Sequence, residues 1–139
     1  MISPQSRDLA GLCPCVRRRW AKLVEACHFS GFDLALIETI RQPDRQAYYV
    51  RIGASKTMDS KHLPQPPHGL SLAVDVCPRE YLSNPLWHPE GELWDRMGGF
   101  AKRFGLLWGG DWPAFVDRPH CYLDACLCAQ DEEENAIDA

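Results

Sequence analysis

The chain has 139 residues, 45% of them hydrophobic and 24% charged, which suffices for one compact domain with one core and excludes a second domain of ordinary size. Its formal net charge is −4, but the segment 131–139 alone contributes −5, so the rest of the chain carries +1. A nearly neutral body excludes nucleic-acid binding through a broad basic surface, and no apolar run approaches the length that spans a bilayer, so we expect no stable membrane association.

The first predicted element is a helix that begins near Val16 and ends at Gly31. Its apolar residues recur at helical spacing: Val16, Trp20, Leu23, Val24 and Cys27. The segment 34–40 is short, apolar and rich in β-branched residues, which predicts a strand with Arg41 just past its end. A short helix over 45–50 follows and is closed by Gly53.

The second half of the chain begins with a proline-rich segment, 63–67, that must lie at the surface or at a sheet edge. Alternation over 70–76 then predicts a strand in which Asp75 points away from the aliphatic face. A helix is predicted from Leu93 to Gly105, and a last strand over 120–123. The acidic segment 131–139 is expected to be a disordered tail.

The N-terminal segment predicts a cellular compartment, and that compartment in turn predicts the state of the seven cysteines. Residues 1–20 lack the apolar stretch of a secretion signal, so we expect a protein that is cytoplasmic as synthesised. Seven cysteines cannot all pair within one chain, and a cytoplasmic origin favours free thiols. We therefore interpret most of them as buried thiols that take no part in chemistry.

Two Cys-X-Cys pairs offer an alternative: Cys13-Pro14-Cys15 and Cys126-Leu127-Cys128. In each pair one residue separates the cysteines, whereas two to four are usual in structural zinc sites, so the spacing argues against such a site. If the two ends of the chain met in space, the four thiolates could hold one ion. A structural zinc protein therefore stays open as a competing interpretation.

The chemistry of the chain is indicated by two histidines and two aspartates in Ser60-Lys61-His62, Ala73-Val74-Asp75 and Asp117-Arg118-Pro119-His120. Two imidazoles and one carboxylate can hold a zinc ion at three positions and leave the fourth for water. A second carboxylate nearby can take the proton of that water. This set of residues is typical of a metallohydrolase.

Together with Arg41, Arg45-Gln46 and Gly105-Leu106-Leu107-Trp108-Gly109-Gly110-Asp111-Trp112, these motifs resemble the zinc peptidases that cut peptidoglycan stem peptides. That family includes D-alanyl-D-alanine carboxypeptidases and the L-alanyl-D-glutamate endopeptidases used as phage endolysins. The matching blocks run from about Ala21 to Leu123 in the family's order, which covers most of the chain.

The resemblance implies that His62, Asp75 and His120 are the zinc ligands and that Asp117 is the general base. It also makes Arg41 the residue that steadies the developing oxyanion or holds a substrate carboxylate, tasks suited to a planar, permanently charged guanidinium. The competing interpretation of Arg41 is a surface salt bridge.

The resemblance further assigns Ser60, Trp108 and Trp112 to the substrate-binding region. Ser60 either orients His62 through a hydrogen bond or only caps a loop. The two tryptophans either brace the last strand and line the cleft or belong to the core, which is the default for aromatic residues.

The first ligand departs from the family pattern, because His62 lies thirteen positions before Asp75 where the family usually has seven. His68 has the usual spacing, but it lacks the serine two positions earlier that precedes His62. We therefore favour His62, with the extra residues housed in a surface loop. Ser71 stands where the family commonly has glycine, without consequence for a catalytic role.

We therefore expect an α+β fold in which a small, mainly antiparallel sheet is flanked by helices and carries the zinc in a groove. Residues 1–130 would form a monomeric zinc peptidase domain that acts on peptidoglycan stem peptides, reaching the cell wall after release through a separate membrane pore. The scissile bond, L-Ala-D-Glu or D-Ala-D-Ala, stays open. The alternative is a non-catalytic zinc-binding module of the same fold, which would have no need of Asp117.

Overall fold

The computed structural model of the chain describes residues 2–83 and 91–138. In chain order its helices and strands are α1 (Pro14–Ser30), β1 (Leu34–Glu38), α2 (Pro43–Arg51), β2 (Ala73–Pro78), α3 (Glu92–Arg103), β3 (Leu107–Trp108), β4 (His120–Tyr122) and α4 (Cys128–Asp138). Short 3₁₀ turns are η1 (Leu9–Gly11), η2 (Arg79–Tyr81) and η3 (Gly109–Asp111). Among the described residues, no helix is long and apolar enough to cross a membrane.

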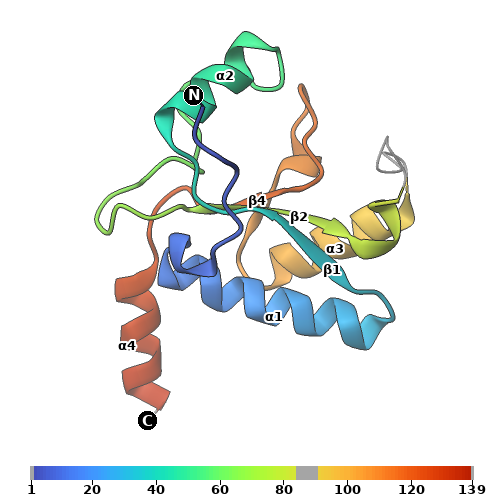
Figure 1. Cartoon of the computed structure of the whole chain (residues 1–139). Helices are drawn as coiled ribbons and strands as arrows, with labels where there is room; N and C mark the ends of the chain where they lie inside the picture. Colours follow the sequence, from blue (N-terminus) through green and yellow to red (C-terminus); the bar gives the residue numbers. More distant parts are fainter. Residues whose placement is uncertain (1, 84–90, 139) are drawn as a thin grey trace.

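The four strands form one antiparallel sheet in the order β1-β2-β4-β3. Helices α1 and α3 lie against one face of it, while α2 lies on the other side (Figure 1). The expected α+β fold is confirmed. The helices on the first face cover the core, and the second face is left for the loops that carry functional side chains.

The core lies between the sheet and the apolar faces of α1 and α3. Val74 and Val76 of β2 are fully buried against side chains such as Leu23 of α1 and Met97 of α3. Burial of each such side chain stabilises the fold by about 1.5–3 kcal/mol. Since successive strand residues point to opposite faces, burying Val74 and Val76 sends Asp75 to the other face, as the sequence predicted.

Helix α1 shows how local sequence sets the ends of an element. Pro14 occupies its first turn, where the missing N–H costs nothing. Gly31 ends it in the left-handed region at φ 109°, with its N–H bonded to the carbonyls of Cys27 and His28. Both ends therefore follow from residues that the sequence places there.

The C-terminal segment differs from the expected disordered tail, because residues 128–138 form helix α4. Asp131 is buried and pairs with Arg18 and Arg19 of α1 at 2.8 Å. Asp131 also lies in the first turn of α4, where the helix dipole favours a negative charge. In the structure this residue joins α4 to the body of the protein, and the domain boundary at residue 131 stays a prediction.

Candidate functional site

The site is built on the sheet face away from α1 and α3. Asp75 of β2 and His120 of β4 are direct cross-strand partners, and Glu38 of β1 pairs with Asp75 from the other side. Partners in an antiparallel sheet point to the same face at close range. Strand register alone therefore places these three polar side chains together.

His62 reaches the same place from the loop that precedes β2. Its ring is 1% exposed, and its Nδ1 lies 2.7 Å from the carbonyl oxygen of Thr39. A carbonyl only accepts, so Nδ1 carries the proton and Nε2 is left for the site. Nε2 lies 2.9 Å from Oδ1 of Asp75, and Nδ1 of His120 lies 3.2 Å from the same oxygen.

These three side chains fit a metal ion. One donor atom from each of His62, Asp75 and His120 lies within 4.8 Å of the other two. In the neutral tautomer of His62, the Nε2 lone pair faces a carboxylate oxygen, and this contact is repulsive unless a proton or a metal ion lies between them. Two imidazoles and one carboxylate are ligands that first-row transition metals accept.

The electrostatics of this group also favour a cation. Burial works against ionisation of Asp75, but His62 and His120 outweigh it and hold the pKa of the carboxyl well below its usual range. Burial likewise opposes protonation of His62, yet the Asp75 carboxylate raises the pKa of the imidazole. The arrangement therefore favours a positive charge, a proton or a metal ion, between these groups.

The loop that precedes β2 explains the unusually long spacing between His62 and Asp75. Gln65 and Leu70 pair across it, and His68 is exposed at its tip rather than near Asp75. The extra residues are thus housed in a surface loop, as predicted, and His62 is the histidine brought to the site.

Arg41 lies beside this group and is only 8% exposed. Its Nη2 donates to Glu38 at 2.6 Å, its Nη1 donates to Gln46 at 2.7 Å, and its guanidinium lies 4.5 Å from the centre of the Tyr49 ring. Nη2 is also 3.7 Å from Oδ2 of Asp75. Arg41 is therefore held rigidly at the site, and the surface salt-bridge interpretation is wrong.

Glu38 is a buried residue of the site that the sequence did not reveal. It is 1% exposed and pairs with Arg41 while Arg45 lies 3.6 Å away. A lone carboxylate inside an apolar strand was the available signal, because such groups are rarely buried without a partner.

Gln46 is fully buried, and its Nε2 donates hydrogen bonds to the Ser55 hydroxyl and the Thr57 carbonyl. These bonds connect α2 to the loop that follows it.

Asp117 lies in the loop before β4. The loop is closed by the Asp117 N–H, which donates to the Gly109 carbonyl at 3.0 Å. A Cβ on Gly109 would lie 2.3 Å from the Asp117 carbonyl oxygen, so this approach requires glycine. Burial, followed by the negative charge of Asp75, raises the pKa of Asp117 to about 6. A carboxyl group with this pKa can exchange protons near neutral pH.

The two tryptophans have different positions. Trp112 lines the site, where its Nε1 donates to the Tyr122 hydroxyl at 3.0 Å and its ring centre lies 5.2 Å from that of His120. Trp108 belongs to the core and donates to the Arg118 carbonyl. The prediction that Trp108 lines the cleft is therefore wrong, because its ring packs against Gly98 of α3.

Ser60 lies at the wall of the site, but its hydroxyl accepts from the backbone N–H of His62 at 3.2 Å and not from the ring. It therefore caps the loop, and the ring of His62 is oriented by Thr39 instead.

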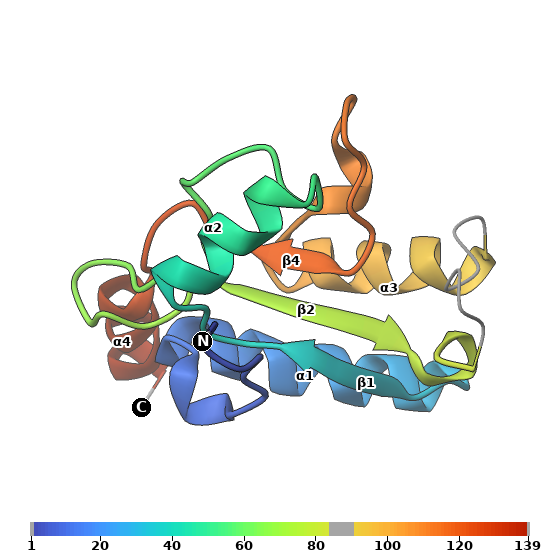
Figure 2. The same ribbon diagram turned by 45° about the horizontal axis from the view of Figure 1, so that its top comes forward.

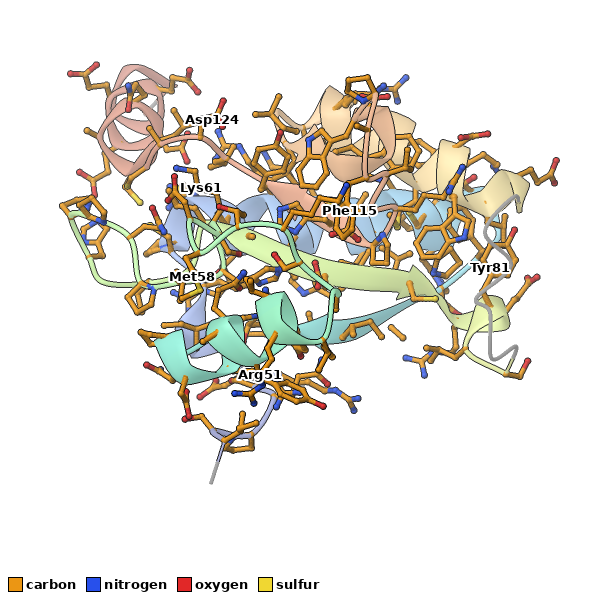
Figure 3. All side chains as sticks on the ribbon, turned by 90° about the horizontal axis from the view of Figure 1, so that it is seen from above. Arg51, Met58, Lys61, Tyr81, Phe115 and Asp124 are labelled. Carbon is orange, nitrogen blue, oxygen red and sulfur yellow. The ribbon has the colours of Figure 1, made fainter. Side chains whose placement is uncertain are left out.

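An open cavity of about 540 Å³ leads to these groups. One wall comes from α2 and residues 54–62, and the other from residues 112–122. In Figure 2 these two walls rise on the same side of the sheet, and Figure 3 shows Phe115 across β2 from α2. Lys56 reaches to 4.9 Å from the Phe115 ring, which brings the two walls together at the rim.

Comparison with known proteins gives a consistent pattern. Residues 55–123 match a family described as D-alanyl-D-alanine carboxypeptidase. The chain is 33% identical over 99 residues to an L-alanyl-D-glutamate peptidase of Listeria phage A118, a match that covers 71% of this chain and 33% of the phage protein. The chain thus spans about a third of the length of that relative.

Further relatives include the peptidoglycan L-alanyl-D-glutamate endopeptidase CwlK of Bacillus subtilis, 26% identical over 119 residues and covering 78% of this chain and 71% of CwlK. Among solved structures, the L-Ala D-Glu endopeptidase ChiX of Serratia marcescens superposes with a TM-score of 0.65 at 24% identity, covering 91% and 92% of the two chains. The LD-carboxypeptidase LdcB superposes with a TM-score of 0.55 at 14% identity, covering 97% of this chain and 70% of LdcB. Both solved structures therefore have the same fold as this chain.

Proposed function

We propose that the chain is a zinc-dependent peptidase that hydrolyses peptidoglycan stem peptides, a proposal supported by the match of residues 55–123 to a family described as D-alanyl-D-alanine carboxypeptidase. The observation that carries the proposal is the convergence of His62, Asp75 and His120 at the base of an open cavity with a second carboxylate, Asp117, on its wall. A purely structural ion site needs neither the cavity nor that carboxylate.

His62, Asp75 and His120 would hold the ion. Two imidazoles and one carboxylate form a common catalytic zinc set, and the bound ion supplies Lewis-acid activation of water and of the scissile carbonyl. The hydrogen bond from Nδ1 of His62 to the Thr39 carbonyl keeps Nε2 directed at the site, and metal-binding histidines are usually oriented by such a bond from their other ring nitrogen.

Asp117 takes the proton of the attacking water and then passes it to the leaving amine. Its raised pKa suits both halves of that task, since the group must accept a proton and release it near neutral pH. In the metal-free protein, burial and the nearby Asp75 both raise this pKa.

Arg41 stabilises the negative charge that develops on the carbonyl oxygen, or anchors a substrate carboxylate. Glu38, Gln46 and Tyr49 fix its guanidinium, so no side-chain ordering has to accompany substrate binding. Trp112 and Tyr122 on the opposite wall offer apolar surface to the peptide, with Ser60 at the edge of the cavity.

We infer that the scissile bond lies between L-alanine and D-glutamate, because both curated relatives described above are named for that bond. Cleavage of D-Ala-D-Ala is the second candidate, since the matching family is described by it. We further infer that the protein acts as a monomer on the cell wall and leaves the cytoplasm through a separate pore.

The test is digestion of purified peptidoglycan followed by mass spectrometry of the products. Endopeptidase action yields soluble peptides that begin with D-glutamate, whereas carboxypeptidase action yields stem peptides one D-alanine shorter. Absence of both products with a zinc-loaded protein would refute the enzymatic proposal and leave the non-catalytic binding module.

A further inference from the structure

The two Cys-X-Cys pairs, 113 residues apart in the chain, lie together in the structure. Cys13 precedes the first residue of α1, and Cys128 is the first residue of α4. Figures 1 and 2 both show the start of α4 beside the start of α1, away from the peptidase site. Cys13, Cys15 and Cys128 are buried, and Cys126 is partly exposed.

The sulfur positions suit a single ion. Sγ of Cys13 lies 3.6 Å from Sγ of Cys126 and 3.6 Å from Sγ of Cys128. All four sulfurs lie within 4.8 Å of one another. A regular tetrahedron with zinc–sulfur bonds of about 2.3 Å has edges of about 3.8 Å. The separations also exceed the roughly 2.05 Å of a disulfide bond, so the four thiols face one another without pairing.

Backbone N–H groups and helix ends near the cluster can offset the negative charge of metal-bound thiolates. The backbone N–H of Leu127 donates to Sγ of Cys15 at 3.4 Å, and that of Cys128 donates to Sγ of Cys126 at 3.5 Å. The N-termini of α1 and α4 both point to the cluster, and the positive end of a helix dipole stabilises negative charge. Four thiolates around a divalent ion carry a net charge of about −2, which these dipoles and N–H groups offset.

We propose that Cys13, Cys15, Cys126 and Cys128 form a second, structural zinc site that fastens the C-terminal helix α4 to the start of α1. With four protein ligands, such a site has no open position for water or substrate. Its role is therefore to hold structure, and it is independent of the function proposed for His62, Asp75 and His120.

The one-residue spacing does not prevent this site. A zinc knuckle takes two ligands from one tight turn and therefore needs longer spacing. Here each pair lies at the start of a different helix, so the tetrahedron is completed by the meeting of two segments. The usual spacing applies to two ligands on a single local turn, and the meeting of α1 and α4 does not require such a turn.

The site would also brace the catalytic half of the sheet. The Cys13 N–H donates to the Ser71 carbonyl at 2.9 Å, and the neighbouring Leu72 N–H donates to the Lys61 carbonyl at 2.9 Å. Lys61 directly precedes His62. Loss of the ion is therefore expected to loosen α4 and the loop of His62 while leaving the peptidase ligands chemically intact.

The experiment uses the full chain with both peptidase histidines replaced, His62→Ala/His120→Ala, so that only the cysteine site can bind zinc. We expect one zinc per chain, with X-ray absorption at the zinc edge showing about four sulfurs at about 2.3 Å. The natural protein should hold two zinc ions and show about two sulfurs per zinc on average, a measurement that needs no variant to fold.

Cys126→Ala in the double-histidine background should lose the remaining zinc. Cys27→Ala is the matched control, because it removes a fully buried thiol of α1 outside the cluster. Chelation of the double-histidine variant should lower its melting temperature by about 5 °C or more. A zinc shell without sulfur, a zinc content unaffected by Cys126→Ala, or disulfides among the four cysteines in the freshly purified protein would each overturn the proposal.

Discussion

Replacing Asp117 by asparagine removes its ability to transfer a proton while it keeps the size of the side chain. Asparagine has nearly the same size and shape, and the backbone bond from residue 117 to Gly109 is retained. The basic oxygen is lost, so hydrolysis of purified peptidoglycan should fall by about two to four orders of magnitude while zinc binding persists.

The raised pKa of Asp117 also predicts the sign of a stability change. A carboxyl group that titrates at about 6 in the folded protein and at about 3.9 in the unfolded chain favours the folded state below pH 4. Relative to the protonated group, the ionised group therefore costs the folded state up to about 3 kcal/mol once the pH has risen through 6. Asp117→Asn should therefore raise the melting temperature of the metal-free protein at pH 7 and have little effect at pH 4.

The assay combines three measurements on the natural protein, Asp117→Asn and the control Asp111→Asn. Asp111 lies on the same loop but forms an exposed pair with Lys102, so its replacement should change neither turnover nor stability appreciably. Zinc content, melting temperature at pH 4 and 7, and stem-peptide release are compared. Turnover retained in a zinc-loaded Asp117→Asn protein, or a lowered melting temperature at pH 7, would refute the reasoning.

Three further predictions concern other residues. His62→Ala should abolish metal binding at the peptidase site, whereas His68→Ala should leave it intact, as measured by zinc content in a protein whose cysteine site is removed; the opposite result would reverse the ligand assignment. Arg41→Lys keeps the positive charge next to buried Glu38 but loses the planar pair of donors. We therefore expect a folded, zinc-binding protein with turnover reduced by roughly a hundredfold. Unchanged turnover would leave Arg41 with a structural role alone. Arg19, together with Arg18 and against the opposing effect of burial, lowers the pKa of Asp131 to about 2. Its stabilising pairs are therefore present above pH 4 and are lost as the pH falls through 2. Asp131→Asn should cost about 1–3 kcal/mol in urea unfolding at pH 7 and less as the pH falls through 2.

The sequence alone sufficed for the features that depend on neighbouring residues. Alternation around Asp75 predicted its face of the sheet, because burying Val74 requires the next side chain to point away. Apolar spacing and Gly31 predicted the extent of α1. The serine before His62 favoured that histidine over His68, and the structure brings His62 beside Asp75.

Tertiary structure decided the features that depend on residues distant in the chain. Glu38 pairs with Arg41 inside the protein, and Trp108 turns into the core against Gly98, since neither local pattern contains information about what packs on it. The acidic segment lies in α4, where Asp131 pairs with two arginines more than a hundred residues away in the chain. The cysteine pairs have the same dependence: their spacing argues against a metal site as long as each pair is considered alone, and only the folding of both ends onto one another places four sulfurs around one point.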